Sequence, residues 1–218
     1  LLQAYGSLFF MNSYDLIQDM TFSQSRDFMA GVKAKYDIKD WFTLNLSLHG
    51  DFYDRFKRHE RIDERKKVYK SKIFEPRLTL TSSYFTGHNI ILGVEHTTDE
   101  LTSDRFVNRR MTTRSLHETE YFLQDEWTVN SHWMLSSGVR TNFSKAFGFM
   151  WMPKIAIKYA PDNHWALRAN YSMGYRAPSI KELFFNWDHL GMFQIKGSEN
   201  LQSEKNNYFS LGAEYSKE

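Results

Sequence analysis

Apolar and polar residues alternate with a period of two along most of the chain. The alternation is clear over 42–48, 135–143, 155–159, 165–173 and 205–216. Successive side chains of a strand point to opposite faces, so this pattern predicts strands with one apolar face and one polar face. No segment keeps the 3.6-residue period of an amphipathic helix. We therefore expect an all-β chain with little helix.

The alternation predicts about ten strands. They cover 1–10, 27–36, 42–53, 72–84, 90–98, 117–128, 134–143, 149–160, 165–175 and 205–216. Tilted strands that cross a bilayer have roughly 9–11 residues, whereas strands of soluble sheets average roughly 5–6. The predicted strands are of the longer kind. A soluble antiparallel sandwich is the alternative, and it would have to bury the alternating face against a second sheet.

The connections between these strands are alternately short and long. Short turns occur at 36–41, 85–89, 129–133 and 160–165, and polar stretches lie at 54–70, 99–115 and 176–203, with a shorter one near 144–148. Outer-membrane β-barrels have short periplasmic turns and long extracellular loops, so the pattern favours an antiparallel transmembrane β-barrel. Trp41, Trp133 and Trp165 end three of the short turns. This predicts an aromatic girdle at one membrane boundary.

The composition narrows the choice of protein class. Aromatic residues make up 17% of the chain although its mean hydropathy is −0.58, and there is no cysteine. The absence of cysteine excludes a disulfide scaffold and a thiolate metal site. No run of 18 apolar residues could form a transmembrane helix. A net charge of +2 gives no reason to expect nucleic-acid binding.

No motif of a known catalytic site occurs in the sequence. It contains no HExxH, no paired CxxC, no glycine-rich phosphate loop and no nucleophile elbow. Asp125 and Glu126 are adjacent in a predicted strand and point to opposite faces, so they could not share a substrate. We therefore expect no enzyme. The chain opens on LLQAYGSLFF without a signal peptide, and we expect it to be a fragment of a longer polypeptide.

The segment YRAPSIKELFFNWDHLGMFQ, residues 175–194, carries the most distinctive chemistry. It follows the strand 165–175, which ends at the rim of the long loops, so we expect the segment at the outer mouth of the barrel. His189 and Met192 lie there among Phe184, Phe185, Trp187 and Phe193.

Two short boxes flank this histidine. Tyr175-Arg176-Ala177-Pro178 precedes it, and Ser198-Glu199-Asn200-Leu201 follows it, with Glu204 behind. This arrangement resembles the TonB-dependent outer-membrane receptors, and within them the haem and haemoglobin receptor branch of Bacteroidetes-type bacteria. That branch carries an Asn-Pro-Asn-Leu-type second box, of which this chain lacks the Asn-Pro half.

The resemblance implies a fold and a set of partners. Such receptors have a plug domain inside a barrel of about 22 strands, so residues 1–218 would supply about ten strands of the barrel domain, without the plug. The implied location is the outer membrane of a Gram-negative bacterium. The implied partners are its lipid, the TonB energy-coupling complex acting through the plug, and a surface lipoprotein.

The resemblance also implies active import of a large metal chelate, with no permanently bound cofactor. Haem is the first expectation, and a corrinoid such as cobalamin or a ferric siderophore is the alternative. A porin or an outer-membrane enzyme is less favoured. A porin would show rings of charge at a constriction, and an enzyme would need a nucleophile beside a base.

The expected ligand residues follow from the chemistry of haem. Its iron accepts an imidazole, a phenolate or a thioether, and its macrocycle stacks on aromatic rings. We expect His189 to bind the metal, with Tyr175 and Met192 as neighbours. The expected stacking wall consists of Phe184, Phe185, Trp187 and Phe193. The alternative is an ordinary loop histidine, with aromatic side chains that close the loop onto the rim.

Overall fold

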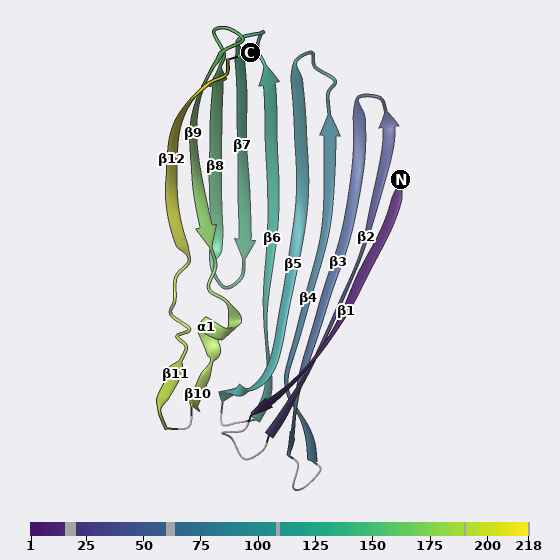
Figure 1. Ribbon diagram of the computed structural model, residues 1–218, viewed down its shortest axis with the longest axis vertical. Coiled ribbons are helices and arrows are strands. Elements are labelled where there is room, and N and C mark those ends of the chain that lie inside the picture. Colours follow the sequence, from purple (N-terminus) through teal and green to yellow (C-terminus); the bar gives the residue numbers. More distant parts are fainter. Residues whose placement is uncertain (16–20, 60–63, 108–109, 190, 218) are drawn as a thin grey trace.

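The computed structural model describes residues 1–218 except 16–20, 60–63, 108–109, 190 and 218. Ten long strands form one antiparallel sheet in which each strand pairs with its neighbours in sequence (Figure 1). They are β1 (Leu2–Asp15), β2 (Thr21–Lys39), β3 (Phe42–His59), β4 (Glu64–Ser82), β5 (His88–Val107), β6 (Arg110–Thr128), β7 (Trp133–Ser144), β8 (Gly148–Tyr159), β9 (Trp165–Arg176) and β12 (Glu204–Tyr215). The predicted all-β fold with about ten strands is confirmed.

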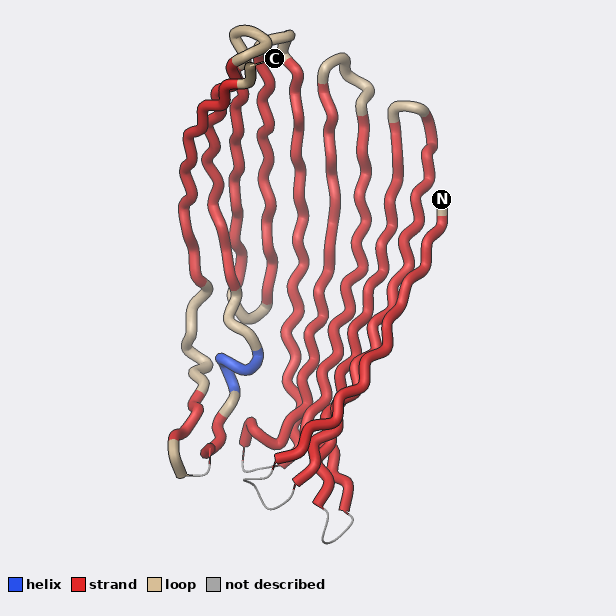
Figure 2. Tube along the Cα trace, in the orientation of Figure 1, coloured by secondary structure: helices blue, strands red, loops and turns tan. Residues whose placement is uncertain are grey.

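The segment between β9 and β12 is the one large departure from this ladder. It contains the short helix α1 (Ile180–Phe184) and a small hairpin of β10 (Asn186–His189) and β11 (Phe193–Lys196). Figure 2 shows α1 as the blue turn beside an otherwise red sheet. Among the described residues, no helix combines the length and the apolar character that crossing a membrane requires.

The four predicted short turns lie at one rim of the sheet and the long segment 176–203 lies at the other, as the loop pattern predicted. The turns after β2, β4, β6 and β8 share the upper rim of Figure 1, and the segment with α1 lies at the lower rim. Trp133 stacks on Tyr159 with ring centroids 4.3 Å apart, and Trp165 lies 4.9 Å from Tyr215. Trp133, Trp165 and Tyr215 are exposed and Tyr159 is half-buried, and together these rings form the girdle expected at the turn rim.

Two of the short turns are closed in the same way by a polar side chain. Oδ1 of Asn130 accepts hydrogen bonds from the backbone N–H groups of His132 and Trp133. Oδ1 of Asp162 accepts the matching pair from His164 and Trp165. Side chains of this type stabilise turns by bonding the backbone two or three residues ahead, so these turns need few residues.

The prediction of loops at 54–70 and 99–115 was wrong. Strand β3 continues to His59 and β4 begins at Glu64, while β5 runs to Val107 and β6 begins at Arg110. The polar residues of these stretches pair across the ladder, as in the ion pairs Lys67–Asp54 and Lys72–Glu100, both at 2.8 Å. Because cross-strand pairs of opposite charge stabilise antiparallel sheets in water, a charged composition did not end the strands.

The sheet has one apolar face and one polar face, as the alternation predicted. Leu92, Leu123 and Val139 lie opposite one another on β5, β6 and β7, and all three side chains are exposed. The other face carries cross-strand ion pairs: Arg77–Glu95, Arg140–Glu120 and Arg168–Glu214. We refer to the polar side as the inner face and to the apolar side as the outer face.

This assignment of faces predicts unequal effects for two adjacent substitutions. An arginine on the lipid face near the bilayer midplane costs roughly 2–4 kcal/mol in membrane barrels. Leu123→Arg in the full-length protein should therefore reduce the amount of folded barrel, measured as the heat-modifiable fraction on gels of isolated membranes. Gln124→Arg is the control, because Gln124 lies on the inner face and bonds Glu126, which would accept from the new cation. Equal folded amounts of the two variants would contradict the assignment.

Candidate ligand-binding site

Arg176, at the end of β9, joins three elements at the base of the 177–203 segment. Its guanidinium donates to Oε1 of Glu182 on α1 at 2.6 Å and to Oε1 of Glu204 on β12 at 3.0 Å. Glu182 also completes a capping box with Ser179, whose N–H and hydroxyl both donate to Oε2 at 2.8 Å. The backbone hydrogen bond from Ser179 and the bond from Arg176 lower the pKa of Glu182 to about 2.

The returning chain closes against α1 through its backbone. The N–H of Ser198 donates to the carbonyl of Glu182 at 3.0 Å, and the N–H of Gly197 donates to the carbonyl of Phe185. A Cβ atom at Gly197 would lie 2.7 Å from the Glu182 carbonyl oxygen. Only glycine allows the chain at residue 197 to come this close to the backbone of α1. These backbone hydrogen bonds give the segment a defined conformation.

Three apolar side chains fix α1 and the residue after it to the rest of the molecule. Ile180, Leu183 and Phe185 are 1%, 5% and 8% exposed. Ile180 and Phe185 form a core with Leu101 and Phe106 of β5. Burying a side chain of this size contributes about 1.5–3 kcal/mol. The segment therefore packs against the inner face of β5.

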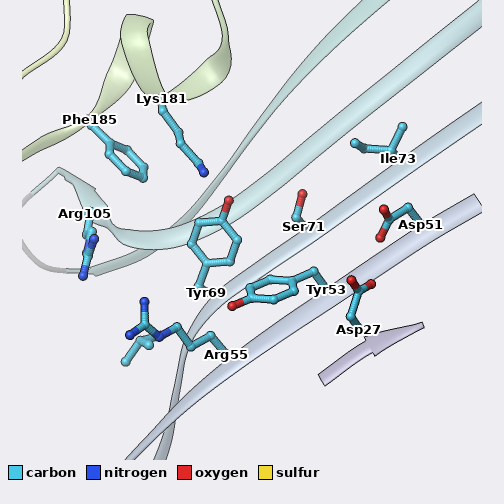
Figure 3. A pocket seen from close by; sticks show the side chains of 11 residues that line it. Asp27, Asp51, Tyr53, Arg55, Tyr69, Ser71, Ile73, Arg105, Lys181 and Phe185 are labelled. Carbon is cyan, nitrogen blue, oxygen red and sulfur yellow. The ribbon is translucent and has the colours of Figure 1, made fainter. Parts of the chain in front are cut away.

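A cavity of about 390 Å³ lies between this segment and the inner face of β2–β5 (Figure 3). It is lined by Asp27, Asp51, Tyr53, Arg55, Val68, Tyr69, Ser71, Ile73, Arg105, Lys181 and Phe185. Val68 and Tyr69 are adjacent and yet both line it, because the register between β3 and β4 shifts at Arg55 and Phe56. A bulge of this kind turns two neighbouring side chains toward one face.

Three cations converge on the cavity: Arg55, Arg105 and Lys181. The Arg105 guanidinium stacks 4.0 Å from the Trp187 ring centroid, and Nζ of Lys181 lies 5.3 Å from that of Tyr69. Burial and the charge of Arg55 lower the pKa of Arg105. In the described part of the chain, none of the three forms an ion pair with a carboxylate.

Tyrosine rings and carboxylates complete the lining. Tyr53 and Tyr69 meet edge to face with centroids 5.6 Å apart, and the Tyr53 hydroxyl lies 2.9 Å from Oγ of Ser25. Figure 3 shows the tyrosines between the basic side chains and the pair Asp27 and Asp51. An anion with aromatic groups would meet charge from the cations and ring contacts from the tyrosines.

Of the residues predicted from the sequence to surround the ligand, Phe185 lines this cavity. His189, Tyr175, Met192, Phe184, Trp187 and Phe193 are not among its lining residues. Tyr175 is half-buried on β9 opposite Lys205, and the Trp187 ring lies under Arg105. Met192 and Phe193 are 68% and 53% exposed at the β10–β11 hairpin. The backbone of His189 pairs with Phe193 at the end of β10, but its side chain lies outside the described residues. Among the described residues, no group of three or more histidines and carboxylates could hold a metal ion.

The basic and tyrosine residues of the cavity could not be recognised from the sequence, for an identifiable reason. Arg55, Tyr69 and Arg105 lie in the two stretches interpreted as solvated loops. Alternation does continue there, since Asp51, Tyr53 and Arg55 occupy every second position of β3. This two-residue period was the signal in the sequence that could have extended β3 to Arg55. Lys181 belongs to the segment 175–194, which the sequence already marked as distinctive.

A family model described as "TonB dependent receptor-like, beta-barrel" matches residues 4–218. The chain belongs to this family. The expected resemblance to TonB-dependent receptors is thus confirmed at the level of the family.

Similar proteins agree with this membership. The "Iron-regulated outer membrane virulence protein" of Vibrio cholerae serotype O1 strain O395 is 27% identical over 152 residues, which are 68% of this chain and 22% of that protein. A solved ferric enterobactin receptor of Pseudomonas aeruginosa superposes with a TM-score of 0.72 at 16% identity, covering 90% of this chain and 33% of that chain.

The siderophore receptor PirA of Acinetobacter baumannii gives a TM-score of 0.66 at 12% identity, with coverage of 90% and 33%. At these identities the structural likenesses show the fold alone. The chain spans about a fifth of the length of its curated relatives and a third of the solved receptors. None of these relatives supports the haem and Bacteroidetes branch in particular.

The low pKa of Glu182 predicts how the mouth segment responds to acid. The folded pKa of about 2 lies below the ordinary value of 4.5, so the stabilisation is complete above pH 4.5 and is lost as the pH falls toward 2. Carboxyl ¹³C NMR of the full-length protein in micelles should show Glu182 titrating near pH 2. Arg176→Gln should raise this pKa, whereas Arg168→Gln, which removes the partner of Glu214, should leave it unchanged. Titration of the wild-type carboxyl near 4.5 would show that the network does not form.

Proposed function

We propose that the chain is part of an outer-membrane receptor that binds a ferric siderophore and imports it actively. The observation that carries this proposal is the cavity at the mouth, where three cations that form no ion pair within the described residues face two tyrosine rings. Ferric complexes of catecholate or carboxylate chelators carry net negative charge, and the catecholate ligands are aromatic. The names of the similar proteins, which concern iron regulation and ferric enterobactin, support the same class of ligand.

The electrostatics of the cavity favour an anion over a neutral ligand. Burial and the charge of Arg55 both disfavour the charged form of Arg105, and the nearby Asp104 offsets part of this cost. Asp27 and Asp51 also line the cavity, but its three cations outnumber these two carboxylates. A bound anion would compensate the charges of Arg55 and Arg105. Interactions of anions with such partly desolvated guanidinium groups are stronger than neutral hydrogen bonds. The tyrosine edges would add contacts that select for a planar ligand.

Haem is the second candidate, and one observation favours it. Met192 and Phe193 are exposed on the same hairpin as the backbone of His189, so a planar ligand could reach these two side chains. His189, Tyr175, Met192, Trp187 and Phe193 are the residues that we propose for this mode. A corrinoid has an amide-rich periphery and gives no reason for three convergent cations.

Import also requires an energy source and a route through the barrel. We propose that the TonB complex acts through a plug domain of the parent polypeptide, as the family implies. A surface lipoprotein that delivers the ligand belongs to the same proposal. The inner face with its ion-paired rows would line the route past the plug.

Binding titrations of the full-length receptor test the proposed ligand class. Arg105→Gln and Lys181→Gln should each weaken the affinity for a ferric tris-catecholate chelate by about 10- to 100-fold, since a hydrogen bond to a charged group contributes about 1.5–3 kcal/mol. Lys154→Gln is the matched control, because it removes one inner-face cation from β8 outside the cavity. Titration with haem of the wild type and of His189→Ala forms the second arm.

Three results are distinguishable. Loss of chelate affinity in the two cavity variants with an unchanged control supports the siderophore proposal. Unchanged chelate affinity in both cavity variants contradicts it. Tight haem binding that depends on His189, with a changed Soret band in His189→Ala, would instead favour the haem mode.

A further inference from the structure

A second group of basic residues lies on the outer face, away from the cavity. We call Arg26 of β2 and Arg65, Lys67, Lys70 and Lys72 of β4 the cationic shelf. The cross-strand register places Arg26 opposite Asp54 and Asp54 opposite Lys70. These positions alternate with Asp27, Tyr53 and Tyr69, which line the cavity, so Arg26, Lys70 and Lys72 face the opposite side of the sheet. Beyond the register shift Lys67 lies opposite Phe56, two positions after Asp54, and this keeps Lys67 and Arg65 on the same outer side.

The outer face changes in character along these strands. Leu46, Leu48 and Leu78 are exposed on the side toward the short turns. Further along, Phe28, Phe52 and Phe74 are exposed at 47%, 44% and 47%, and the rings of Phe28 and Phe52 stack with centroids 6.2 Å apart. The cationic shelf follows directly, since Lys72 lies opposite Phe52. A surface crossing from hydrocarbon to lipid headgroups shows this order of aliphatic, aromatic and charged residues.

The cationic shelf is held together despite its charge. The Arg65 guanidinium lies 3.9 Å from the Phe56 ring centroid, with Nζ of Lys67 at 5.1 Å and the Arg26 guanidinium at 5.6 Å from the same centroid. Nη2 of Arg65 also donates to Oε1 of Gln24 at 2.7 Å. The Phe56 ring thus makes cation–π contacts with three cations and holds their side chains close together without a bound anion.

Carboxylates compensate only part of this charge. Lys67 pairs with Asp54 and Lys72 with Glu100. Five basic residues and two acidic residues leave a net charge of +3, and none of the ion pairs within the described residues includes Arg26, Arg65 or Lys70. The uncompensated charge faces the level where lipid headgroups begin.

We propose that the cationic shelf binds phosphate groups of an anionic lipid in the outward-facing leaflet. This inference rests on the outer-membrane location of the proposed function. A siderophore in the cavity cannot contact the cationic shelf, because the sheet lies between them. Cations beside an anionic membrane surface attract lipid phosphates over about one Debye length, which is about 8 Å at physiological salt. The aromatic residues Phe28, Phe52 and Phe74 set the depth at which this contact occurs.

The test compares two triple variants of the full-length receptor in mixed micelles of zwitterionic detergent and phosphatidylglycerol. Arg26→Gln/Arg65→Gln/Lys70→Gln removes the cations of the shelf that form no ion pair within the described residues. Lys33→Gln/Lys154→Gln/Lys158→Gln removes the same charge from the inner face, outside the cavity. Native mass spectrometry measures how much phosphatidylglycerol each protein retains. We expect about 10-fold or greater loss of retention in the shelf variant and no loss in the control.

Two further measurements separate a lipid site from a general attraction of phosphate to positive charge. Inorganic phosphate at the same phosphate concentration should not displace the lipid, because it lacks the acyl chains that anchor the headgroup beside the phenylalanines. Displacement by inorganic phosphate, or equal lipid retention in both triple variants, would overturn the proposal. Affinity for the ferric tris-catecholate chelate is measured in parallel and should stay at the wild-type value in the shelf variant. A failure of the lipid site is thereby separated from a failure of the proposed import function.

Discussion

The hydrogen-bond ladder between sequence-adjacent antiparallel strands is the constraint on which the other features of this chain depend. A membrane leaves no water to satisfy backbone groups, so a spanning sheet must pair every strand along its length. Here the pairing runs without a crossover from β1 to β9 and then to β12. That order fixes which residues stand opposite one another and therefore which side chains share the inner face and the outer face.

The ladder also creates the platform for the candidate site. Strands β3 to β6 continue past the end of β7 and β8 and form a wall at the mouth (Figure 1). The segment after β9 packs α1 on this wall through Ile180 and Phe185. The network around Arg176 ties the same segment to β12. Because both attachments hold one short segment, Lys181 reaches the cavity from a fixed backbone, so the site that we propose would be assembled before a ligand binds.

Much of this fold could be predicted from the sequence, because its signals are local. The alternation over 42–48 reflects the two faces of a single strand. The tryptophans after the short turns mark a single membrane boundary. The length of β3 and β5 could not be found in this way, since ion pairs such as Lys72–Glu100 join residues of different strands. A polar composition therefore indicated loops where the structure has paired strands.

The candidate site shows the same limit. The importance of the segment 175–194 was predicted, but the predicted metal ligand was His189, because a histidine is a common metal ligand. Lys181 gains importance only through Arg55 and Arg105, which lie far from it in sequence and meet it across the mouth (Figure 3). The bulge that turns Val68 toward the cavity beside Tyr69 leaves no mark in the sequence pattern either. The three cations come together only when the chain is folded, so their convergence could not be predicted from the sequence.

The central claim is that the ligand binds where the mouth segment meets the inner face of the sheet. Anomalous diffraction at the iron edge, from crystals of the full-length receptor soaked with a ferric tris-catecholate chelate, locates the metal directly. We expect an iron peak in the cavity between Arg55, Arg105 and Lys181. An iron peak beside Met192 and Phe193 at the β10–β11 hairpin, with none in the cavity, would contradict it.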